Sequence, residues 1–236
     1  MKRLGIIVAM TAEARSLTKQ TVTQGQLIHL PEGPLVQLSG TGSKSARLAG
    51  GKLLQNDAEA LVSWGSAGGL IPELPPGTLI LPQKILAANG GVYSADREWH
   101  ERLCKRLKAH IYFHRGPLVE SPEVLTSSAE KTALFKRTGA VAVDMESAAV
   151  AAVAHDSGVP FVAIRAIVDP AGMIIPRSVL SAIDEFGQLR FFRFLKELLR
   201  RPMDLFTLIR LGHNFRVAHL SLASAACLAG SNLLVP

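Results

Sequence analysis

The sequence predicts a single-domain, three-layer α/β/α fold with a mixed, mostly parallel central sheet and an amphipathic helical extension at the C-terminus. Short β-branched runs alternate with segments of helical periodicity, as they do where crossover helices join parallel strands. The 236 residues, 48% hydrophobic and 19% charged, suffice for one full core. From Leu180 onward the alternation gives way to longer helical patterns. We therefore expect one α/β domain over residues 1–187 and the helical extension over 188–236.

The predicted strands are short apolar runs bounded by Gly, Pro or polar residues, and they cover residues 4–10, 35–39, 61–65, 78–81, 116–119, 141–144 and 161–167. The predicted helices between them cover residues 44–55, 97–107, 128–138 and 146–157. The last helix stops before Gly158 and Pro160, residues that commonly end a helix.

Cysteine usage and hydropathy indicate a cytoplasmic location. Cys104 and Cys227 lie far apart, with no His or Cys beside either at metal-ligand spacing, so neither a disulfide framework nor a zinc site is predicted. The first apolar run is too short for a signal peptide, and no apolar run reaches the ~20 residues of a spanning helix. Near the C-terminus, polar residues such as Ser221 and Ser224 interrupt the nearest approach to such a run.

The net charge of +7 and the pI of about 9.7 come largely from the C-terminal part of the chain. There, basic residues alternate at helical spacing with Leu189, Phe192, Leu195 and Leu199; the basic residues are Arg190, Arg193, Lys196, Arg200, Arg201, Arg210 and Arg216. One interpretation is an oligomer contact or a helix packed back on the domain. The other is a helix lying on an anionic membrane surface. Nucleic acid is not the expected partner, because the segment lacks the aromatic platforms on which bases stack.

Polar or glycine-rich residues follow several predicted strands, at the edge where parallel sheets bind ligands. They are Glu13, the turn 40–42 containing Gly42, the glycine-rich turn 65–69, the triplet 144–146, and Asp169. Each also has a structural explanation: a tight turn for the glycines, a helix-dipole partner for Glu13, and a turn before Pro170 for Asp169.

Five segments in a fixed order carry a resemblance to a known family: GIIVAMTAEARSL, LSGTGSKSA, VSWGSAGGL, PGTLILP and AVDMESAAVAAVAHDSGVPFVAIRAIVD. The sequence resembles the methylthioadenosine/S-adenosylhomocysteine nucleosidases and their purine and uridine phosphorylase relatives. The resemblance implies the nucleoside phosphorylase type of α/β fold and an enzyme that cleaves the N-glycosidic bond of an adenine nucleoside.

The resemblance also implies roles for individual residues. Glu13 activates water, Asp169 protonates N7 of adenine, and Glu146 binds the ribose hydroxyls. Substrate-binding positions implied beside these catalytic ones are Met145, Arg165, Ser66, Gly68, Gly42, Val124 and Leu125. Met145 packs against the sugar, and Arg165 helps Glu13 to hold the nucleophile. No metal and no cofactor is expected, and a homodimer is expected.

Some positions depart from the family pattern. Val124 and Leu125 stand where the family often has an aromatic residue that stacks on adenine. Ser63 stands where phosphorylases commonly have an Arg that grips phosphate. Lys44 and Arg47 are alternative phosphate ligands, although a solvated helix face is the simpler interpretation of both. Water and phosphate therefore stay open as the nucleophile, the latter as a co-substrate.

The C-terminal segment LLRRPMDLFTLIRL is similar to the ends of hopanoid-associated nucleoside phosphorylases. This resemblance implies a lipid-linked substrate, adenosylhopane, which loses adenine to give ribosylhopane or its phosphate in hopanoid biosynthesis. It also implies peripheral contact with the inner face of the cytoplasmic membrane. The alternatives are an ordinary soluble methylthioadenosine/S-adenosylhomocysteine nucleosidase and a non-catalytic basic protein that binds membrane or nucleic acid.

Overall fold

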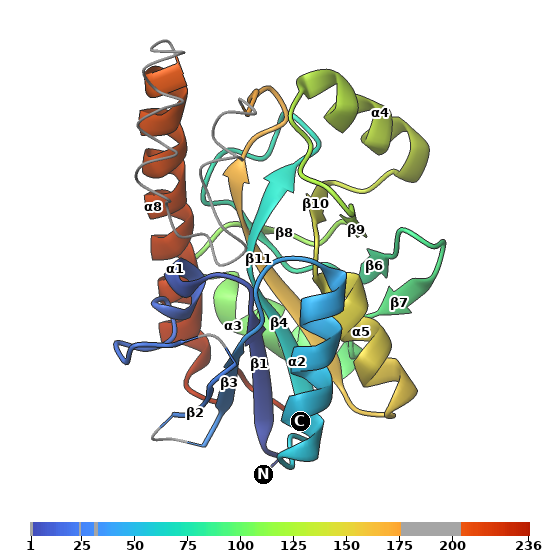
Figure 1. Ribbon diagram of the computed structural model, residues 1–236, viewed down its shortest axis with the longest axis vertical. Coiled ribbons are helices and arrows are strands. Elements are labelled where there is room, and N and C mark those ends of the chain that lie inside the picture. Colours follow the sequence, from blue (N-terminus) through green and yellow to red (C-terminus); the bar gives the residue numbers. More distant parts are fainter. Residues whose placement is uncertain (1, 24, 31–32, 176–203) are drawn as a thin grey trace.

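The computed structural model describes residues 2–23, 25–30, 33–175 and 204–236. These residues form three layers, with a sheet between two groups of helices (Figure 1). The predicted boundary at 187/188 lies outside the described residues, as do the apolar and basic positions predicted between 189 and 201.

In the part of the chain that the structure describes, the central sheet has eleven strands. They are β1 (Leu4–Val8), β2 (Leu27–His29), β3 (Leu35–Leu38), β4 (Ala60–Gly69), β5 (Leu79–Ile80), β6 (Lys84–Leu86), β7 (Val92–Ser94), β8 (Phe113–His114), β9 (Leu118–Glu120), β10 (Ala142–Asp144) and β11 (Phe161–Asp169). The main path runs β2-β3-β1-β4-β10-β9-β6-β7, while β11 pairs with β4 and with β5, which pairs with β8. Six of the ten strand pairings among the described residues are parallel, which confirms the predicted mixed, mostly parallel sheet.

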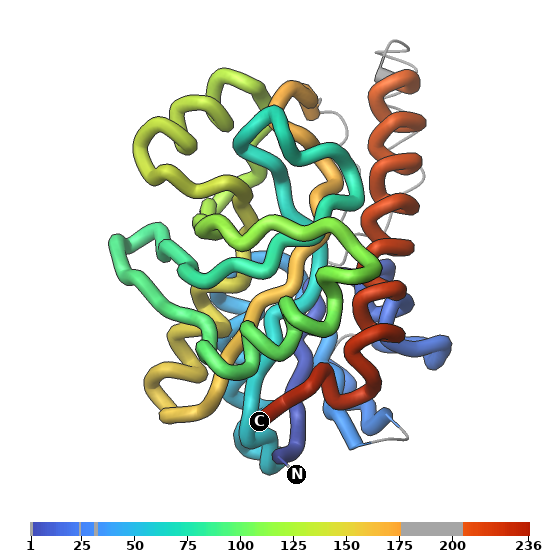
Figure 2. Tube along the Cα trace, turned by 180° about the vertical axis from the view of Figure 1, so that it is seen from behind, coloured from blue at the N-terminus to red at the C-terminus, as the bar shows by residue number. Residues whose placement is uncertain are grey.

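The helices cover both faces of this sheet. They are α1 (Thr11–Ala14), α2 (Ser43–Gln55), α3 (Arg97–Leu107), α4 (Ser128–Thr138), α5 (Ser147–Asp156) and α8 (Asp204–Ala229). Helices α2 and α5 lie on one face, whereas α3 and α8 lie on the other, which Figure 2 shows from behind. None of the described helices combines the length and the apolar composition that a membrane-spanning segment requires.

The two cores follow from alternation of side chains along the strands. In β11, Val162 and Ile164 belong to the core beneath α3 and α8, whereas Ala163 and Ile167 belong to the core beneath α2 and α5. The side chain of Arg165 shares the alternation of Ala163 and Ile167, so a guanidinium group enters an otherwise apolar layer. A buried charge at such a position needs partners.

Strand β4 changes its neighbour partway along its length. Its first half pairs with β1 up to Trp64, and its end pairs with β10 at Gly68 and Gly69, while β11 follows the other edge throughout. One edge of β4 is therefore open between Trp64 and Gly68. A break of this kind at the carboxyl end of parallel strands is where open α/β sheets bind ligands.

Helix α8 is part of the core. Its residues Ala218, Leu222 and Ala225 are each 1% exposed and belong to the cluster beneath α3 and α8. Asn214 Nδ2 donates a hydrogen bond of 2.9 Å to the backbone oxygen of Val168, next to the end of β11. Of the two interpretations of the extension, packing back on the domain thus describes residues 204–229.

Within the described residues, the predicted strands and helices are all present within a few residues of their predicted bounds. The glycine-rich segment 65–69 is a correction: the sequence predicts a turn there, but the segment continues β4, because β11 and β10 supply it with hydrogen-bonding partners. Elements that the sequence did not reveal are β2, β6, β7, β8 and α1, which have two to four residues each and are too short to show a period.

Candidate active site

A cavity of about 180 Å³ opens at the break along β4. Eight of the ten predicted site residues line it, namely Glu13, Ser66, Gly68, Val124, Leu125, Met145, Glu146 and Asp169. The other two, Gly42 and Arg165, do not line the cavity but contact the acidic residues that do. Segments from five separate parts of the chain thus meet in one place.

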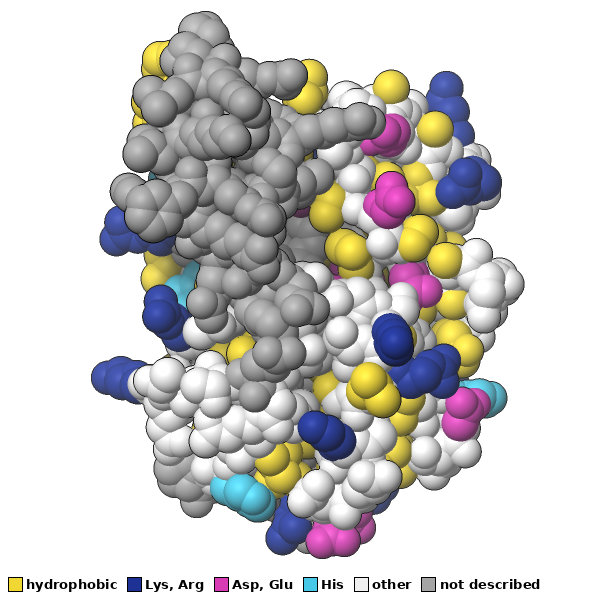
Figure 3. Space-filling model, in the orientation of Figure 1, with side chains coloured by type: hydrophobic (Ala, Val, Ile, Leu, Met, Phe, Trp, Pro, Cys, Tyr) yellow, Lys and Arg dark blue, Asp and Glu magenta, His cyan; other side chains and the backbone are white. Residues whose placement is uncertain are grey.

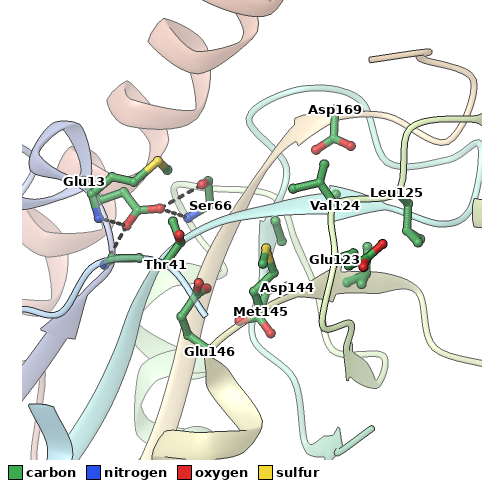
Figure 4. Close-up of a pocket in the computed structure, with 15 residues that line it drawn as sticks. Glu13, Thr41, Ser66, Glu123, Val124, Leu125, Asp144, Met145, Glu146 and Asp169 are labelled. Carbon is green, nitrogen blue, oxygen red and sulfur yellow. Dashed lines mark hydrogen bonds between the residues drawn. The ribbon is translucent and has the colours of Figure 1, made fainter. Parts of the chain in front are cut away.

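Glu13 lies in α1, directly after β1, and is 3% exposed. Its Oε2 accepts hydrogen bonds of 3.0 Å from the backbone N–H groups of Ala9 and Met10. Its Oε1 accepts two of 2.8 Å from Ser66, one from the backbone N–H and one from the hydroxyl group (Figure 4). The first pair ties Glu13 to the start of the short helix, where the sequence predicts it as a partner of the helix dipole. The second pair ties Glu13 to the open edge of β4.

The glycines of β4 allow this close approach. A Cβ atom on Gly65 would lie 2.5 Å from Arg165 Nη1 and 2.6 Å from Glu13 Oε1. A Cβ atom on Gly68 would lie 3.0 Å from Asp169 Oδ2. These glycines therefore make room for the charged side chains of Arg165, Glu13 and Asp169, and neither glycine has a φ angle that requires glycine.

Glu146 precedes the first residue of α5 and is 6% exposed. Its Oε1 accepts a hydrogen bond of 2.7 Å from the N–H of Gly42, whose φ of 92° is left-handed and suits glycine. Burial, partly opposed by the charge of Arg165, raises the pKa of Glu146 to about 7. The group therefore titrates near neutrality, a property common at functional sites.

Arg165 is 1% exposed and satisfies its guanidinium within the protein. Its Nη2 lies 2.7 Å from Asp144 Oδ2 and donates to the hydroxyl groups of Ser63 at 2.6 Å and Ser147 at 3.0 Å. Glu146 Oε2 is more distant, at 3.9 Å. The main partner of Arg165 is thus Asp144. The role in which Arg165 helps Glu13 to hold the nucleophile stays a prediction.

Asp169 ends β11 and faces the cavity, with its side chain 16% exposed. Its Oδ2 lies 2.8 Å from Nζ of Lys131, a residue of α4 that is fully buried. Burial raises the pKa of Asp169, although the Lys131 ammonium group acts in the opposite direction. A raised pKa favours the protonated carboxyl group, which is the form that donates a proton.

Apolar side chains complete the cavity. Val124 and Leu125 lie on the side opposite Glu13, and Asp169 stands close to them in the view of Figure 4. Met145 lies between the two acidic groups Glu146 and Asp169 in the same view. The cavity thus has one end with Glu13 and Ser66 and another that is apolar apart from carboxyl groups.

Three lining or supporting residues were missed by sequence reasoning. Asp144 belongs to a triplet noted only for its place after a strand, and Glu123 resembles any exposed loop residue. Lys131 had no sequence signal, because a lysine in an amphipathic helix normally faces solvent. Within the described part of the chain, no cluster of three or more His, Cys, Asp or Glu side chains is placed to hold a metal ion.

The sequence of this chain is similar to those of known proteins. The family model described as Phosphorylase superfamily matches residues 3–199. A 5′-methylthioadenosine/S-adenosylhomocysteine nucleosidase of Baumannia cicadellinicola subsp. Homalodisca coagulata is 30% identical over 206 residues, covering 74% of this chain and 89% of that protein.

Solved structures share the fold. The 5′-methylthioadenosine/S-adenosylhomocysteine nucleosidase of Neisseria meningitidis, in complex with methylthio-immucillin-A, matches with a TM-score of 0.67 at 21% identity, covering 96% of this chain and 100% of that one. The futalosine hydrolase of Helicobacter pylori matches with a TM-score of 0.69 at 18% identity, covering 96% and 97%. Since these matches span nearly the whole chain, α8 falls largely within the shared fold. The resemblance to the methylthioadenosine/S-adenosylhomocysteine nucleosidases and their phosphorylase relatives is confirmed, and the chain belongs to the phosphorylase superfamily.

Proposed function

We propose that this chain cleaves the N-glycosidic bond of an adenine nucleoside, with water as the nucleophile. The observation that carries the proposal is the convergence of Glu13, Glu146 and Asp169 on one cavity from three separate parts of the chain. The nucleosidase that is 30% identical to this chain supports the reaction class.

Asp169 is the proposed general acid. The leaving adenine needs a proton on N7, and burial raises the pKa of the Asp169 carboxyl group, which favours the protonated form that supplies it. Its place beside Val124 and Leu125 favours the apolar end of the cavity as the site of the planar base. Protonation turns the base into a neutral leaving group as the bond between N9 and C1′ breaks.

Glu146 is the proposed ligand of the ribose hydroxyls. As the glycosidic bond breaks, positive charge develops on the sugar, and a carboxylate held by Gly42 at 2.7 Å stabilises that charge. Because only the ionised form does this, the raised pKa of Glu146, about 7, makes the reaction sensitive to pH in the neutral range.

The charge of the cavity favours water over phosphate. Five carboxyl groups line it, those of Glu13, Glu123, Asp144, Glu146 and Asp169, and no Lys or Arg of the described residues does. A phosphate dianion would therefore meet like charges at short range. The two residues predicted as alternative phosphate ligands face solvent instead. Lys44 is exposed, and the Arg47 side chain is 56% exposed and lies 3.8 Å from Asp156.

Glu13 receives the proton that the attacking water releases. A carboxylate has about four acceptor positions, and four donors already occupy those of Glu13. Three of the donors are backbone N–H groups, whereas the Ser66 hydroxyl group is able to rotate. The water therefore reaches Glu13 by displacing that hydroxyl group, its oxygen bonds to C1′, and its proton passes to Oε1.

An apolar group on the ribose is the finer part of the proposal, with adenosylhopane as the candidate. Support comes from exposed apolar side chains at the end of the molecule toward which the parallel strands point. Ile174 is 62% exposed, Phe206 71% and Ile209 63%. The last two stand in the first turns of α8, which extends beyond the ends of β4 and β11 in Figures 1 and 2.

The distribution of basic residues over the described chain favours a lipid-linked substrate over a nucleic-acid partner. On the face drawn in Figure 3, Lys and Arg side chains are scattered among acidic and hydrophobic ones. Arg210 and Arg216 on α8 are both exposed, which suits contact with anionic headgroups beside an apolar group.

The test compares adenine release from adenosylhopane and from methylthioadenosine, with and without phosphate, in ¹⁸O-labelled water. We expect release without phosphate and one ¹⁸O atom at C1′ of the sugar product. Formation of a sugar 1-phosphate would contradict water as the proposed nucleophile. If neither substrate released adenine, the proposed function would be contradicted. Much faster release from methylthioadenosine would favour the soluble nucleosidase.

Point substitutions test the apolar contact better than truncation does, because removing α8 would expose the core. Phe206→Ser and Ile209→Ser should lower kcat/KM for adenosylhopane and leave methylthioadenosine cleavage unchanged, since both side chains are exposed. Leu48→Ser, at a 63% exposed position of α2, is the matched control. Equal losses on both substrates would remove these residues from lipid recognition.

A further inference from the structure

Lys131 is buried, and nothing in its own helix requires a charged residue at this position. Helix α4 presents Lys131 and Leu134 to the interior, whereas Lys136 and Arg137 are exposed. A leucine or methionine at position 131 would satisfy the helix pattern, and burying an ammonium group is costly unless it is paired. The charge at this position therefore calls for an explanation beyond packing.

The contacts of Lys131 supply that explanation. Among the described residues, the contacts of its ammonium group lie at the end of β11 and in the segment that follows: Nζ is 2.8 Å from Asp169 Oδ2, 3.1 Å from the backbone oxygen of Asp169, 2.9 Å from that of Pro170 and 3.4 Å from that of Met173. Three N–H donors thus face four acceptors, so the ammonium group has no reason to turn elsewhere. The neighbouring residue Val168 is held by the neutral side chain of Asn214, whose Nδ2 donates to its backbone oxygen.

We propose that Lys131 is a positioning residue for Asp169: it occupies Oδ2, so that the proton to be transferred resides on Oδ1. Because protonated Oδ2 would place its hydrogen against the ammonium group, only the other oxygen is free to carry and deliver the proton. This inference rests on the proposed function, in which Asp169 protonates the leaving base. Lys131 does not touch the substrate, since it is fully buried and does not line the cavity.

Lys131 also governs the pH range in which Asp169 retains its proton. Its positive charge favours the carboxylate, so a neutral side chain at this position lets Asp169 stay protonated to higher pH. Within the described part of the chain, the other titratable groups that line the cavity are Glu13, Glu123, Asp144 and Glu146, and all are acidic. Loss of Lys131 therefore has two separable effects, a slower proton transfer and a shifted alkaline limb.

The experiment measures kcat and kcat/KM for adenine release between pH 5 and pH 9 in Lys131→Met, with Lys136→Met as a control on the exposed side of the same helix. We expect Lys131→Met to lower kcat at least tenfold and to move the alkaline limb of kcat/KM upward by about one to three pH units. Lys136→Met should match the unmodified chain. A lowered kcat with an unmoved limb would mean that Lys131 only holds the loop, and would overturn the proposal.

Two further variants separate charge from packing. Lys131→Gln keeps an N–H donor without the charge, and should restore part of kcat while keeping the shifted limb. In an Asp169→Asn background, Lys131→Met should cost little more, because the residue acts through Asp169. If the losses of kcat from the two substitutions were independent and additive, action of Lys131 through Asp169 would be contradicted.

A direct titration keeps this test independent of the proposed function. The carboxyl carbon of Asp169 is followed by ¹³C NMR in the unmodified chain and in Lys131→Met, or in Lys131→Gln if the methionine variant does not fold. A higher pKa for Asp169 in the variant supports the proposal, and an unchanged pKa overturns it, whether or not adenine is released. Absence of adenine release with a shifted carboxyl pKa would instead refute the proposed function alone.

Discussion

Replacing Glu146 by Gln should stabilise the fold at alkaline pH while it impairs catalysis. The carboxyl group is buried, and its pKa rises from an ordinary 4.5 to about 7 in the folded chain. A folded pKa above the unfolded one means that the stabilising contribution is fully present below pH 4.5 and is lost as the pH rises through 7. Since one pKa unit corresponds to about 1.4 kcal/mol, ionised Glu146 costs the fold about 3 kcal/mol at pH 8.

Gln removes that cost with little change of shape. Its amide oxygen is able to accept the hydrogen bond from Gly42, and Arg165 keeps Asp144 at 2.7 Å. Urea unfolding should therefore show Glu146→Gln more stable than the unmodified chain by up to about 3 kcal/mol at pH 8, with the difference nearly gone at pH 4. Glu123→Gln, at an exposed carboxyl group of the same cavity, should change stability at neither pH.

The kinetic consequence has the opposite sign. In the unmodified chain, kcat/KM should fall about tenfold between pH 8 and pH 6, because only about a tenth of Glu146 is ionised one unit below its pKa. Glu146→Gln should lose this acid limb and lower kcat about a hundredfold at pH 8. A variant no more stable than the unmodified chain at pH 8, with the acid limb retained, would show that Glu146 is not the group that titrates.

Three other substitutions test the remaining parts of the site and the fold. Asp169→Asn should slow adenine release about a hundredfold or more with an unchanged circular dichroism spectrum, and release within a few-fold of normal would remove Asp169 from the mechanism. Gly65→Ala should sharply reduce kcat, because its Cβ would lie 2.5 Å from Arg165 Nη1 and 2.6 Å from Glu13 Oε1; Gly51→Ala, where a Cβ has open space, is the control. Leu222→Ala should destabilise the fold by about 2–5 kcal/mol in urea unfolding, since the side chain is 1% exposed; a loss below 1 kcal/mol would contradict its place in the core.

The sequence alone predicts the layers and most of the residues that converge on the candidate site. The apolar run 161–167 predicts a buried strand of a mostly parallel sheet, and β11 has that form. Position along the chain also predicts which residues converge, because the carboxyl ends of parallel strands meet at one edge. Glu13, Glu146 and Asp169 therefore share a cavity as expected. These features depend on local periodicity and on the order of strands along the chain, and both can be seen in a single sequence.

Only the tertiary structure decided how the charges pair. The glycine-rich segment 65–69 has the local pattern of a turn, yet it continues β4 because two other strands bond to it. Lys131 meets Asp169 across 38 residues of chain, and Arg165 meets Asp144 across a strand connection. Local sequence does not record such pairs, because a lysine that faces solvent and one that faces a buried carboxylate occupy the same kind of helix position. The difference arises from the free energy of burial, which depends on what the rest of the fold places opposite each side chain.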